Sequence, residues 1–324
     1  MPRTGVAGST GRPDPGTVRS MASPTGTSDA PFGRMLTAMV TPFTADGALD
    51  VDGAQRLAAH LVDEQRNDGL VVSGTTGESP TTSDAEKAML LRAVVEAVGD
   101  RATVIAGAGT YDTEHSVALA RSAERAGAHG LLLVTPYYSK PPQEGVHRHF
   151  TTVADATGLP VMLYDIPGRT GVPIAVETLI RLAAHPRIVA VKDAKGDFFA
   201  SSQVMAATDL AFYSGDDALN LPWLSVGACG FVSVVGHVVG GELASMIDLY
   251  LTGRVEGARE THRRLLPVIA GIMTRTQGAI MAKAALRLVG RPVGPVRSPL
   301  VDATREQENL LRVDLVAGGV KLSD

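Results

Sequence analysis

The sequence lacks several features that would place it in a special class of protein. Its 324 residues include a single cysteine, Cys229, so an internal disulfide is excluded, and a chain of this length needs none to fold. The longest apolar runs, such as residues 130–134 and 231–235, fall far short of the roughly 20 residues that a membrane-spanning helix requires. We therefore expect a water-soluble chain without a membrane partner. The near absence of cysteine favours a reducing, cytoplasmic location.

The sequence also lacks an excess of positive charge, since 30 Lys and Arg residues face 34 Asp and Glu residues. The formal net charge is -4 at pH 7, and 20% of the residues are charged while 44% are hydrophobic, which is ordinary for a globular protein. A protein that binds nucleic acid normally carries a basic surface that neutralises phosphates. Nucleic acid is therefore not an expected partner.

Residues 1–33 differ from the rest of the chain. They are rich in Gly, Pro, Ser and Thr and have almost no apolar side chains to bury. They also lack the continuous apolar segment of about 7 to 15 residues that a secretory signal needs. We predict a disordered N-terminal extension over residues 1–33.

From residue 34 onward, short apolar runs alternate with segments of helical periodicity. In the first helical segment, Val51, Ala54, Leu57, Leu61 and neighbouring residues recur at spacings of three and four, which gives one apolar face. Later segments carry a capping box at Ser83 and Glu86 and a terminating glycine at Gly127. Eight strands are predicted, over residues 36–43, 69–73, 103–108, 130–135, 160–166, 188–193, 210–214 and 230–235.

These elements predict the fold class. Strands that are apolar almost throughout are buried on both faces, as in a parallel sheet covered by helices. Eight β/α units in about 220 residues fit a closed (β/α)8 TIM barrel, which we place at residues 34–253. A doubly wound open sheet is the alternative, but it usually has fewer strands and a glycine-rich turn after the first one. After residue 253, helices over residues 258–271 and 280–288 predict a C-terminal helical region, residues 254–324.

Lys192 is the most unusual residue at the predicted strand ends, where TIM barrels place their reactive groups. It is one of only six lysines, and it lies in a strand that otherwise calls for full burial. Burial disfavours the ammonium form and lowers the pKa of a lysine, which leaves a neutral amine that attacks carbonyl carbons. Two structural alternatives remain open: an amine that reaches out to solvent, or an ion pair with Asp193 or Asp217.

Other polar residues at the strand ends support a reactive lysine. Tyr164 is the fifth residue of its strand and Lys192 the fifth of the next, so the two project at a similar height, and the phenol is a candidate proton shuttle. The turn at residues 74–77 offers backbone donors and the hydroxyls of Thr75 and Thr76 to a carboxylate, and Arg169 offers a guanidinium to a second one. An ordinary tight turn and a surface salt bridge are the alternatives for these two features.

The motifs of other enzyme classes are missing. The chain has no Cys/His cluster with zinc spacing, no nucleophile elbow around a serine, no phosphate-binding loop lysine and no dinucleotide-binding glycine pattern. We predict an enzyme that uses neither a metal nor any other cofactor.

Five segments together resemble the dihydrodipicolinate synthase family of the N-acetylneuraminate lyase superfamily. They are GTTGES at residues 74–79, TPYYSKP at 135–141, YDIPGRTG at 164–171, VKDA at 191–194 and SGDDA at 214–218. The resemblance implies a lyase with 4-hydroxy-tetrahydrodipicolinate synthase activity in diaminopimelate and lysine biosynthesis. In such enzymes a lysine, here Lys192, forms a Schiff base with pyruvate, and the resulting enamine attacks L-aspartate 4-semialdehyde.

The resemblance also implies roles for single residues. Tyr164, Thr75 and a tyrosine from a neighbouring subunit, which matches Tyr138, form a proton relay. Thr75 and Thr76 hold the pyruvate carboxylate and Arg169 the carboxylate of the semialdehyde, while the backbones of Gly215 and Val232 line the pocket. The expected assembly is a homotetramer, a dimer of dimers.

Two further expectations concern specificity and regulation. GTTGE and the arginine of IPGRTG resemble the synthase more than the sialic-acid or 2-keto-3-deoxysugar lyases. Two alternatives remain: one of these other pyruvate-dependent lyases, or a non-catalytic barrel. Family members that lysine inhibits carry two histidines, an Asn and a Glu in an effector cleft. The matching positions here are Asp84, Lys87, Tyr111 and His115, so we predict weak or no inhibition by lysine.

Overall fold

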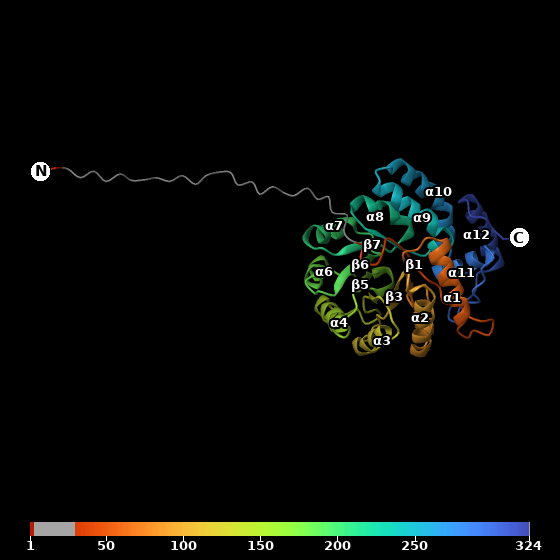
Figure 1. Ribbon diagram of the computed structural model, residues 1–324, viewed down its shortest axis with the longest axis horizontal. Helices are drawn as coiled ribbons and strands as arrows, with labels where there is room; N and C mark the ends of the chain where they lie inside the picture. Colours follow the sequence, from red (N-terminus) through yellow and green to blue (C-terminus); the bar gives the residue numbers. More distant parts are fainter. Residues whose placement is uncertain (3–29, 324) are drawn as a thin grey trace.

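A closed barrel of parallel strands forms the centre of the molecule. The structure is a computed structural model that describes residues 1–2 and 30–323. Within this part of the chain eight strands pair in sequence order, and β8 closes the ring on β1, which confirms the predicted TIM barrel (Figure 1). The strands are β1 (Met35–Ala38), β2 (Gly69–Val72), β3 (Thr103–Gly107), β4 (Gly130–Val134), β5 (Val161–Asp165), β6 (Ile188–Asp193), β7 (Ala211–Ser214) and β8 (Gly230–Ser233).

Side chains alternate between the inside and the outside of the barrel, as the pleat of a strand requires. One set, which includes Leu36, Ile105, Met162 and Tyr164, packs together in the barrel interior. The intervening residues, such as Leu163, join the apolar faces of the helices in a second, larger core. Both faces of the sheet are therefore buried, which explains why the strands read as unbroken apolar runs.

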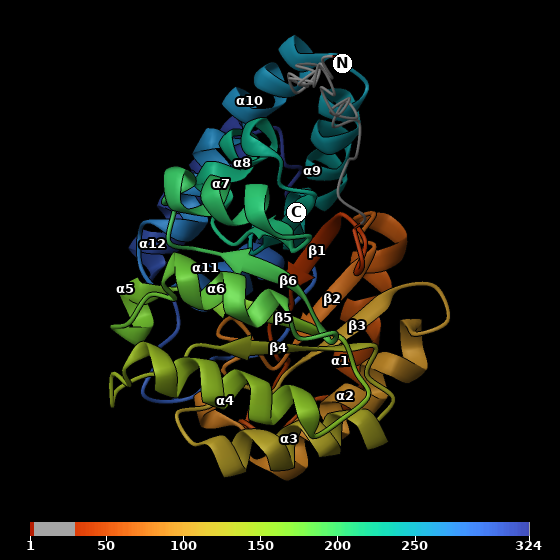
Figure 2. The ribbon, with the colours of Figure 1, turned by 90° about the vertical axis from the view of Figure 1, so that its left-hand side faces the viewer.

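The helices after the strands cover the outside of the barrel (Figures 1 and 2). Ser83 and Glu86 form the predicted capping box at the start of α2, and Gly127 follows α3 with a left-handed φ of 85°. The helical elements of the barrel are α1 (Val51–Ala59), η1 (His60–Glu64), η2 (Ser79–Thr81), α2 (Asp84–Val98), α3 (Thr113–Arg125), α4 (Gln143–Asp155), α5 (Pro167–Thr170), α6 (Val176–Ala183), α7 (Phe198–Ala207), η3 (Asp217–Leu219), α8 (Asn220–Val226) and α9 (Gly236–Leu251).

Three more helices, α10 (Val255–Met273), α11 (Gly278–Leu288) and α12 (Arg305–Ala317), follow at the C-terminal end. The first two include the predicted segments 258–271 and 280–288, and α12 begins with a second capping box at Thr304 and Gln307. In Figure 2 this group lies along one side of the barrel, where α10 and α11 pack against α9. No single helix in the described residues is long and apolar enough to span a membrane; only α10 and α11 together, bent by 115°, meet that test.

The predicted disordered extension over residues 1–33 is too long, because its last four residues belong to the fold. Residues 3–29 lie outside the described residues, but residues 30–33 are part of the fold. Phe32 is only 1% exposed and packs into the barrel interior, and the hydroxyl of Tyr213 donates to the carbonyl of Gly33 over 2.9 Å. Composition averages over a whole segment, so it does not reveal that one large apolar side chain within a polar segment is buried in the core.

β1 is shorter than the predicted strand over residues 36–43. Met39 still donates its N–H to the carbonyl of Val71 in β2 at 3.0 Å, but beyond Met39 the buried chain leaves the sheet because its backbone groups find other partners. The N–H of Val40 donates to Nε2 of His237 at 3.0 Å, and the N–H of Phe43 donates to the carbonyl of Val293 at 3.0 Å. This segment thus links the mouth of the barrel to the C-terminal region.

Candidate active site

Lys192 and Tyr164 lie side by side at the carboxyl ends of β6 and β5. They are register partners in the parallel ladder, and the Nζ atom of Lys192 is 4.1 Å from the centroid of the Tyr164 ring. Their exposed fractions are 5% and 4%. The equal height that strand positions predicted for the two side chains is therefore confirmed.

The environment of Lys192 favours its neutral form. Burial is the main cause that lowers its pKa, to about 8, and the positive charge of Arg169 lowers it further. The negative charge of Asp217 acts in the opposite direction and raises it. About a tenth of the amine is therefore uncharged at pH 7, far more than at the ordinary pKa of 10.5, and the uncharged amine is the form that attacks a carbonyl carbon.

Neither structural alternative accounts for Lys192. The side chain does not reach solvent, and among the described residues no direct ion pair joins it to Asp193 or Asp217. Asp193 accepts hydrogen bonds from the Ser201 hydroxyl at 2.8 Å and from two backbone N–H groups. Asp217 accepts four, from the Ser233 hydroxyl, the Asn220 amide and the N–H groups of residues 234 and 235. The two carboxylates are engaged elsewhere, so the amine stays available.

Tyr164 carries its phenol in a buried, apolar setting. Burial raises its pKa to about 12, while the charge of Arg169 and a hydrogen bond with the Thr75 side chain lower it. The phenol therefore stays protonated at neutral pH. Held between Lys192 and Thr75, it is placed to pass a proton between an amine and a second hydroxyl.

The turn that carries Thr75 is held by its own backbone and by a neighbouring loop. The N–H of Glu78 donates to the carbonyl of Thr75 at 3.2 Å, and the Thr41 hydroxyl donates to the carbonyl of Gly77 at 2.6 Å. Thr76 is buried, with 7% of its surface exposed. This turn follows β2, so it lies on the same face of the barrel as Tyr164 and Lys192.

A cavity of about 230 Å³ opens at this face. Its lining includes three of the predicted site residues, Thr75, Tyr164 and Arg169. The other predicted site residues, Lys192, Thr76, Tyr138, Gly215 and Val232, are not part of the lining. Lys192 borders the cavity through its contact with the ring of Tyr164. A Cβ atom on Gly215 would lie 2.9 Å from Cγ of Lys192, so glycine at this position allows close approach of the two segments.

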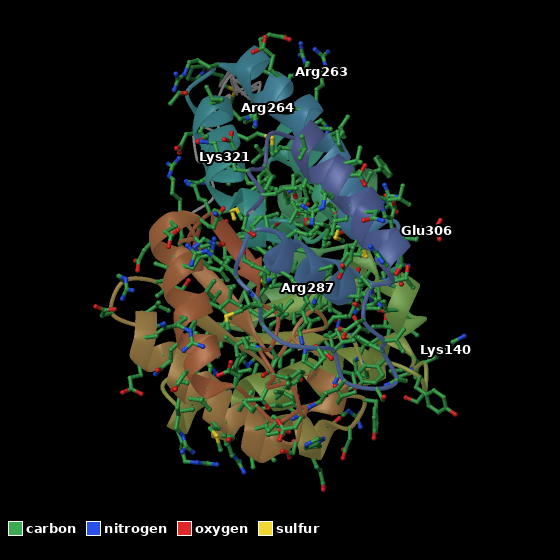
Figure 3. All side chains as sticks on the ribbon, turned by 90° about the vertical axis from the view of Figure 1, so that its right-hand side faces the viewer. Lys140, Arg263, Arg264, Arg287, Glu306 and Lys321 are labelled. Carbon is green, nitrogen blue, oxygen red and sulfur yellow. The ribbon has the colours of Figure 1, made fainter. Side chains whose placement is uncertain are left out.

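The two tyrosines of the TPYYSKP segment point in different directions. Tyr137 lines the cavity, and its ring packs edge to face against Tyr111 with centroids 5.4 Å apart. Tyr138 is 92% exposed and has a left-handed φ of 70°, which is uncommon for a residue other than glycine. Figure 3 shows Lys140, two residues further along, projecting from the edge of the molecule. One chain therefore does not bring Tyr138 into its own site.

Sequence reasoning missed Tyr137 and Ser73 as lining residues. Tyr137 is half-buried, and burial raises the pKa of its phenol. Adjacent tyrosines in a loop give no periodic pattern that would tell which one faces inward.

The described residues contain no group of three or more His, Cys, Asp or Glu side chains arranged to hold a metal ion.

The chain matches one family of known proteins along most of its length. Residues 31–317 match the profile of the dihydrodipicolinate synthetase family. A 4-hydroxy-tetrahydrodipicolinate synthase 2 of Streptomyces coelicolor is 68% identical over 300 residues, which cover 93% of this chain and 100% of that protein. A 4-hydroxy-tetrahydrodipicolinate synthase of Acidothermus cellulolyticus is 69% identical over 290 residues, 90% of this chain and 94% of the relative.

A solved structure shows the same fold. The crystal structure of dihydrodipicolinate synthase from Cyanidioschyzon merolae with lysine bound superposes with a TM-score of 0.87 at 45% sequence identity. The match covers 90% of this chain and 99% of that one. The likeness therefore includes the C-terminal helices as well as the barrel.

Proposed function

Because the chain belongs to the dihydrodipicolinate synthetase family and catalyses the 4-hydroxy-tetrahydrodipicolinate synthase reaction, we propose that Lys192 is the residue that binds pyruvate covalently. The reaction joins pyruvate to L-aspartate 4-semialdehyde, a lyase step in diaminopimelate and lysine biosynthesis. One observation carries the assignment of Lys192: an amine buried at a strand end, with its pKa lowered to about 8, lies beside a phenol at the cavity face of the barrel.

The proposed chemistry begins with attack of the neutral Lys192 amine on the C2 carbonyl carbon of pyruvate. Tyr164 supplies a proton to the hydroxyl group of the resulting carbinolamine, and this group departs as water. A protonated imine remains. Loss of a proton from C3 gives an enamine. Its C3 forms the new bond to the aldehyde carbon of the semialdehyde, the aldehyde oxygen takes up a proton and becomes a hydroxyl, and the protonated imine re-forms at C2. The amino group of the semialdehyde portion then attacks C2, and the C2–N bond to Lys192 breaks. The lysine is thereby regenerated.

The binding residues follow from the charges of the two substrates. The amides and hydroxyls of the Thr75 and Thr76 turn hold the carboxylate of pyruvate, and Arg169 holds the carboxylate of the semialdehyde. The backbones of Gly215 and Val232 confine the pyruvate portion next to Lys192. No metal or organic cofactor enters the proposal, because the protonated imine itself withdraws the electrons that activate C3.

The assembly and location are further parts of the proposal. Tyr138 completes the proton relay in the site of a neighbouring subunit, within a homotetramer built as a dimer of dimers. The outward position of Tyr138, at 92% exposure, supports this, as does its left-handed backbone, a strained arrangement that functional sites often retain. We also infer a cytoplasmic location, which the single cysteine favours.

Trapping with borohydride tests the assignment of Lys192. Reduction in the presence of pyruvate converts the imine to a stable amine, so a three-carbon adduct is expected on the peptide that contains Lys192. Lys192→Ala abolishes the adduct, whereas Lys321→Ala, at an exposed lysine, leaves it unchanged. An adduct on another residue, or none in the unaltered protein, contradicts the proposal.

A comparison of acceptors tests the substrate preference. We expect turnover of pyruvate with aspartate semialdehyde and little with N-acetylmannosamine, because Arg169 is placed for a carboxylate that the sugar does not have. Faster turnover of the sugar favours the sialic-acid lyase alternative. Absence of turnover with either acceptor favours a non-catalytic barrel.

A further inference from the structure

A buried ion pair joins the Thr75 and Thr76 turn to the C-terminal helices. Oε1 of Glu78, at the end of the turn, is 2.7 Å from Nζ of Lys283 in α11. Oε2 of Glu78 accepts the backbone N–H of Arg297 at 2.8 Å. The exposed fractions of the Glu78 and Lys283 residues are 2% and 1%. Both oxygens of the carboxylate are thus bound by the C-terminal region.

The two charged groups are held by further contacts. Lys283 also donates to the carbonyl of Pro295 at 2.7 Å, and its Nζ lies 4.3 Å from the centroid of the Phe43 ring. The Arg297 guanidinium stacks on the same ring at 4.1 Å and binds the carboxylate of Glu86. The ammonium of Lys283 is therefore held between the loop that follows α11 and the segment that follows β1.

The carboxylate of Glu78 is close to the substrate-binding threonines in the chain. Glu78 has a left-handed φ of 54°, and its N–H closes the turn on the carbonyl of Thr75. Its own carbonyl accepts the N–H of Thr81 at 3.0 Å. Displacement of the carboxylate would therefore shift the turn on which the Thr75 and Thr76 hydroxyls are mounted.

Stability alone gives little reason for such a pair. Removing both charges from water carries a large desolvation penalty, and replacing a buried ion pair by apolar side chains of similar volume is often neutral or stabilising. An ion pair is, however, more directional than an apolar contact and fixes the position of the groups it joins. The pair also fixes a strained backbone conformation, which persists only where its surroundings hold it.

We propose that Glu78 and Lys283 are positioning residues for the Thr75 and Thr76 turn, so that the C-terminal helices help to set the affinity for the carboxylate of pyruvate. The inference rests on the proposed function of that turn. It assigns the C-terminal region a part in substrate binding, although none of its residues lines the cavity.

Two substitutions test the proposal. Lys283→Met removes the ammonium and leaves Glu78 unpaired, and Glu78→Gln combined with Lys283→Met removes both charges. Arg287→Met is the matched control, because Arg287 lies on the same helix, shown in Figure 3, and pairs with Glu308 at the surface. The measurements are the pyruvate concentration that half-saturates borohydride trapping at Lys192, kcat and KM for pyruvate, and the melting temperature.

The double variant separates positioning from stability. We expect it to recover most of the melting temperature that Lys283→Met loses, since no charge is left unpaired. Its half-saturating pyruvate concentration and KM stay raised by about tenfold, because the turn that carries Thr75 and Thr76 is no longer held in place; tenfold corresponds to about 1.4 kcal/mol of binding free energy. At saturating pyruvate, kcat changes much less, because Lys192 and Tyr164 are untouched. The control keeps normal values.

Other outcomes overturn the inference. If the double variant restores both the melting temperature and the KM, the pair serves stability only. If it does not fold, the role of the pair lies in folding, and that result also counts against positioning. Failure of the proposed function is a different result, because then the unaltered protein itself shows no pyruvate adduct at Lys192.

Discussion

The Nζ atom of Lys192 lies 4.1 Å from the centroid of the Tyr164 ring, and the two residues are direct register partners on β6 and β5. Each side chain excludes water from the other, and burial is the largest cause of both pKa shifts. The shifts have opposite chemical consequences. The amine becomes easier to deprotonate while the phenol becomes harder to deprotonate, so a nucleophile and a proton donor coexist at neutral pH.

The lowered pKa of Lys192 predicts the pH dependence of adduct formation. Only the neutral amine reacts, so the initial rate of pyruvate trapping should rise about tenfold per pH unit below the pKa and level off above a midpoint of about 8. Quenched samples analysed by mass spectrometry measure this rate, and circular dichroism checks that the fold is intact at each pH. A midpoint near the ordinary lysine value of 10.5 would show that burial does not control the amine.

Mixing of two inactive variants tests the origin of Tyr138. Tyr138→Phe should lower kcat by about 10²- to 10⁴-fold, as loss of a proton-transfer group does, and Lys192→Ala should abolish activity. Refolding equal amounts of the two variants together should restore activity to about a quarter of normal. Half of the dimers then contain one subunit of each kind, and in such a dimer one of the two sites has both an intact Lys192 and an intact Tyr138 from the partner.

The control for this experiment is Tyr111→Phe, at another exposed tyrosine, which should retain activity when refolded alone. If the mixture of Tyr138→Phe and Lys192→Ala stays inactive while each variant assembles normally, Tyr138 does not serve a neighbouring site.

The close approach of Gly215 to Lys192 predicts that a single methyl group is harmful there. In Gly215→Ala the new Cβ would lie 2.9 Å from Cγ of Lys192 and 3.0 Å from the carbonyl oxygen of Asp193. Relief of these contacts must move the lysine, and a displacement of about 1 Å in an active site can cost about 10²-fold in rate. The stability cost of such overpacking is about 1 to 3 kcal/mol.

Gly145→Ala is the comparison for this variant. Gly145 lies in α4, where the nearest atom to a new Cβ is 3.4 Å away, so normal kcat and an unchanged or slightly higher melting temperature are expected. Equal activity of the Gly215→Ala protein and the unaltered protein would contradict the role of glycine at position 215.

The contacts of Asp84, Lys87 and His115 support the expectation of weak or no inhibition by lysine. Nε2 of His115 lies 2.9 Å from the carboxylate of Asp84, and the half-buried ammonium of Lys87 donates to the carbonyl of Thr82. A free lysine would bring a second ammonium next to that of Lys87, which is unfavourable. Millimolar lysine should therefore change the initial rate less than twofold, with sodium chloride of equal ionic strength as the control. A saturable inhibition curve would show that an effector site exists.

Much of the fold could be predicted because its determinants are local. Alternating apolar runs and helical segments located all eight strands, and capping residues such as Ser83 and Gly127 marked helix ends. The prediction was less accurate where a segment finds partners far away in the chain. Val40 and Phe43 leave the sheet for His237 and Val293, so β1 ends early, and Phe32 is buried because the base of the barrel has room for it.

The chain order of the residues was enough to place Lys192 and Tyr164 at equivalent positions on neighbouring strands, since parallel strands that follow one another bring their ends to one face of the barrel. Closure of the barrel and docking of α11 decided the rest: which tyrosine of the 135–141 segment faces the cavity, and that Glu78 meets Lys283. The physical reason is that periodicity and capping act over a few residues. The burial of a charged or aromatic side chain, in contrast, depends on every element that packs around it.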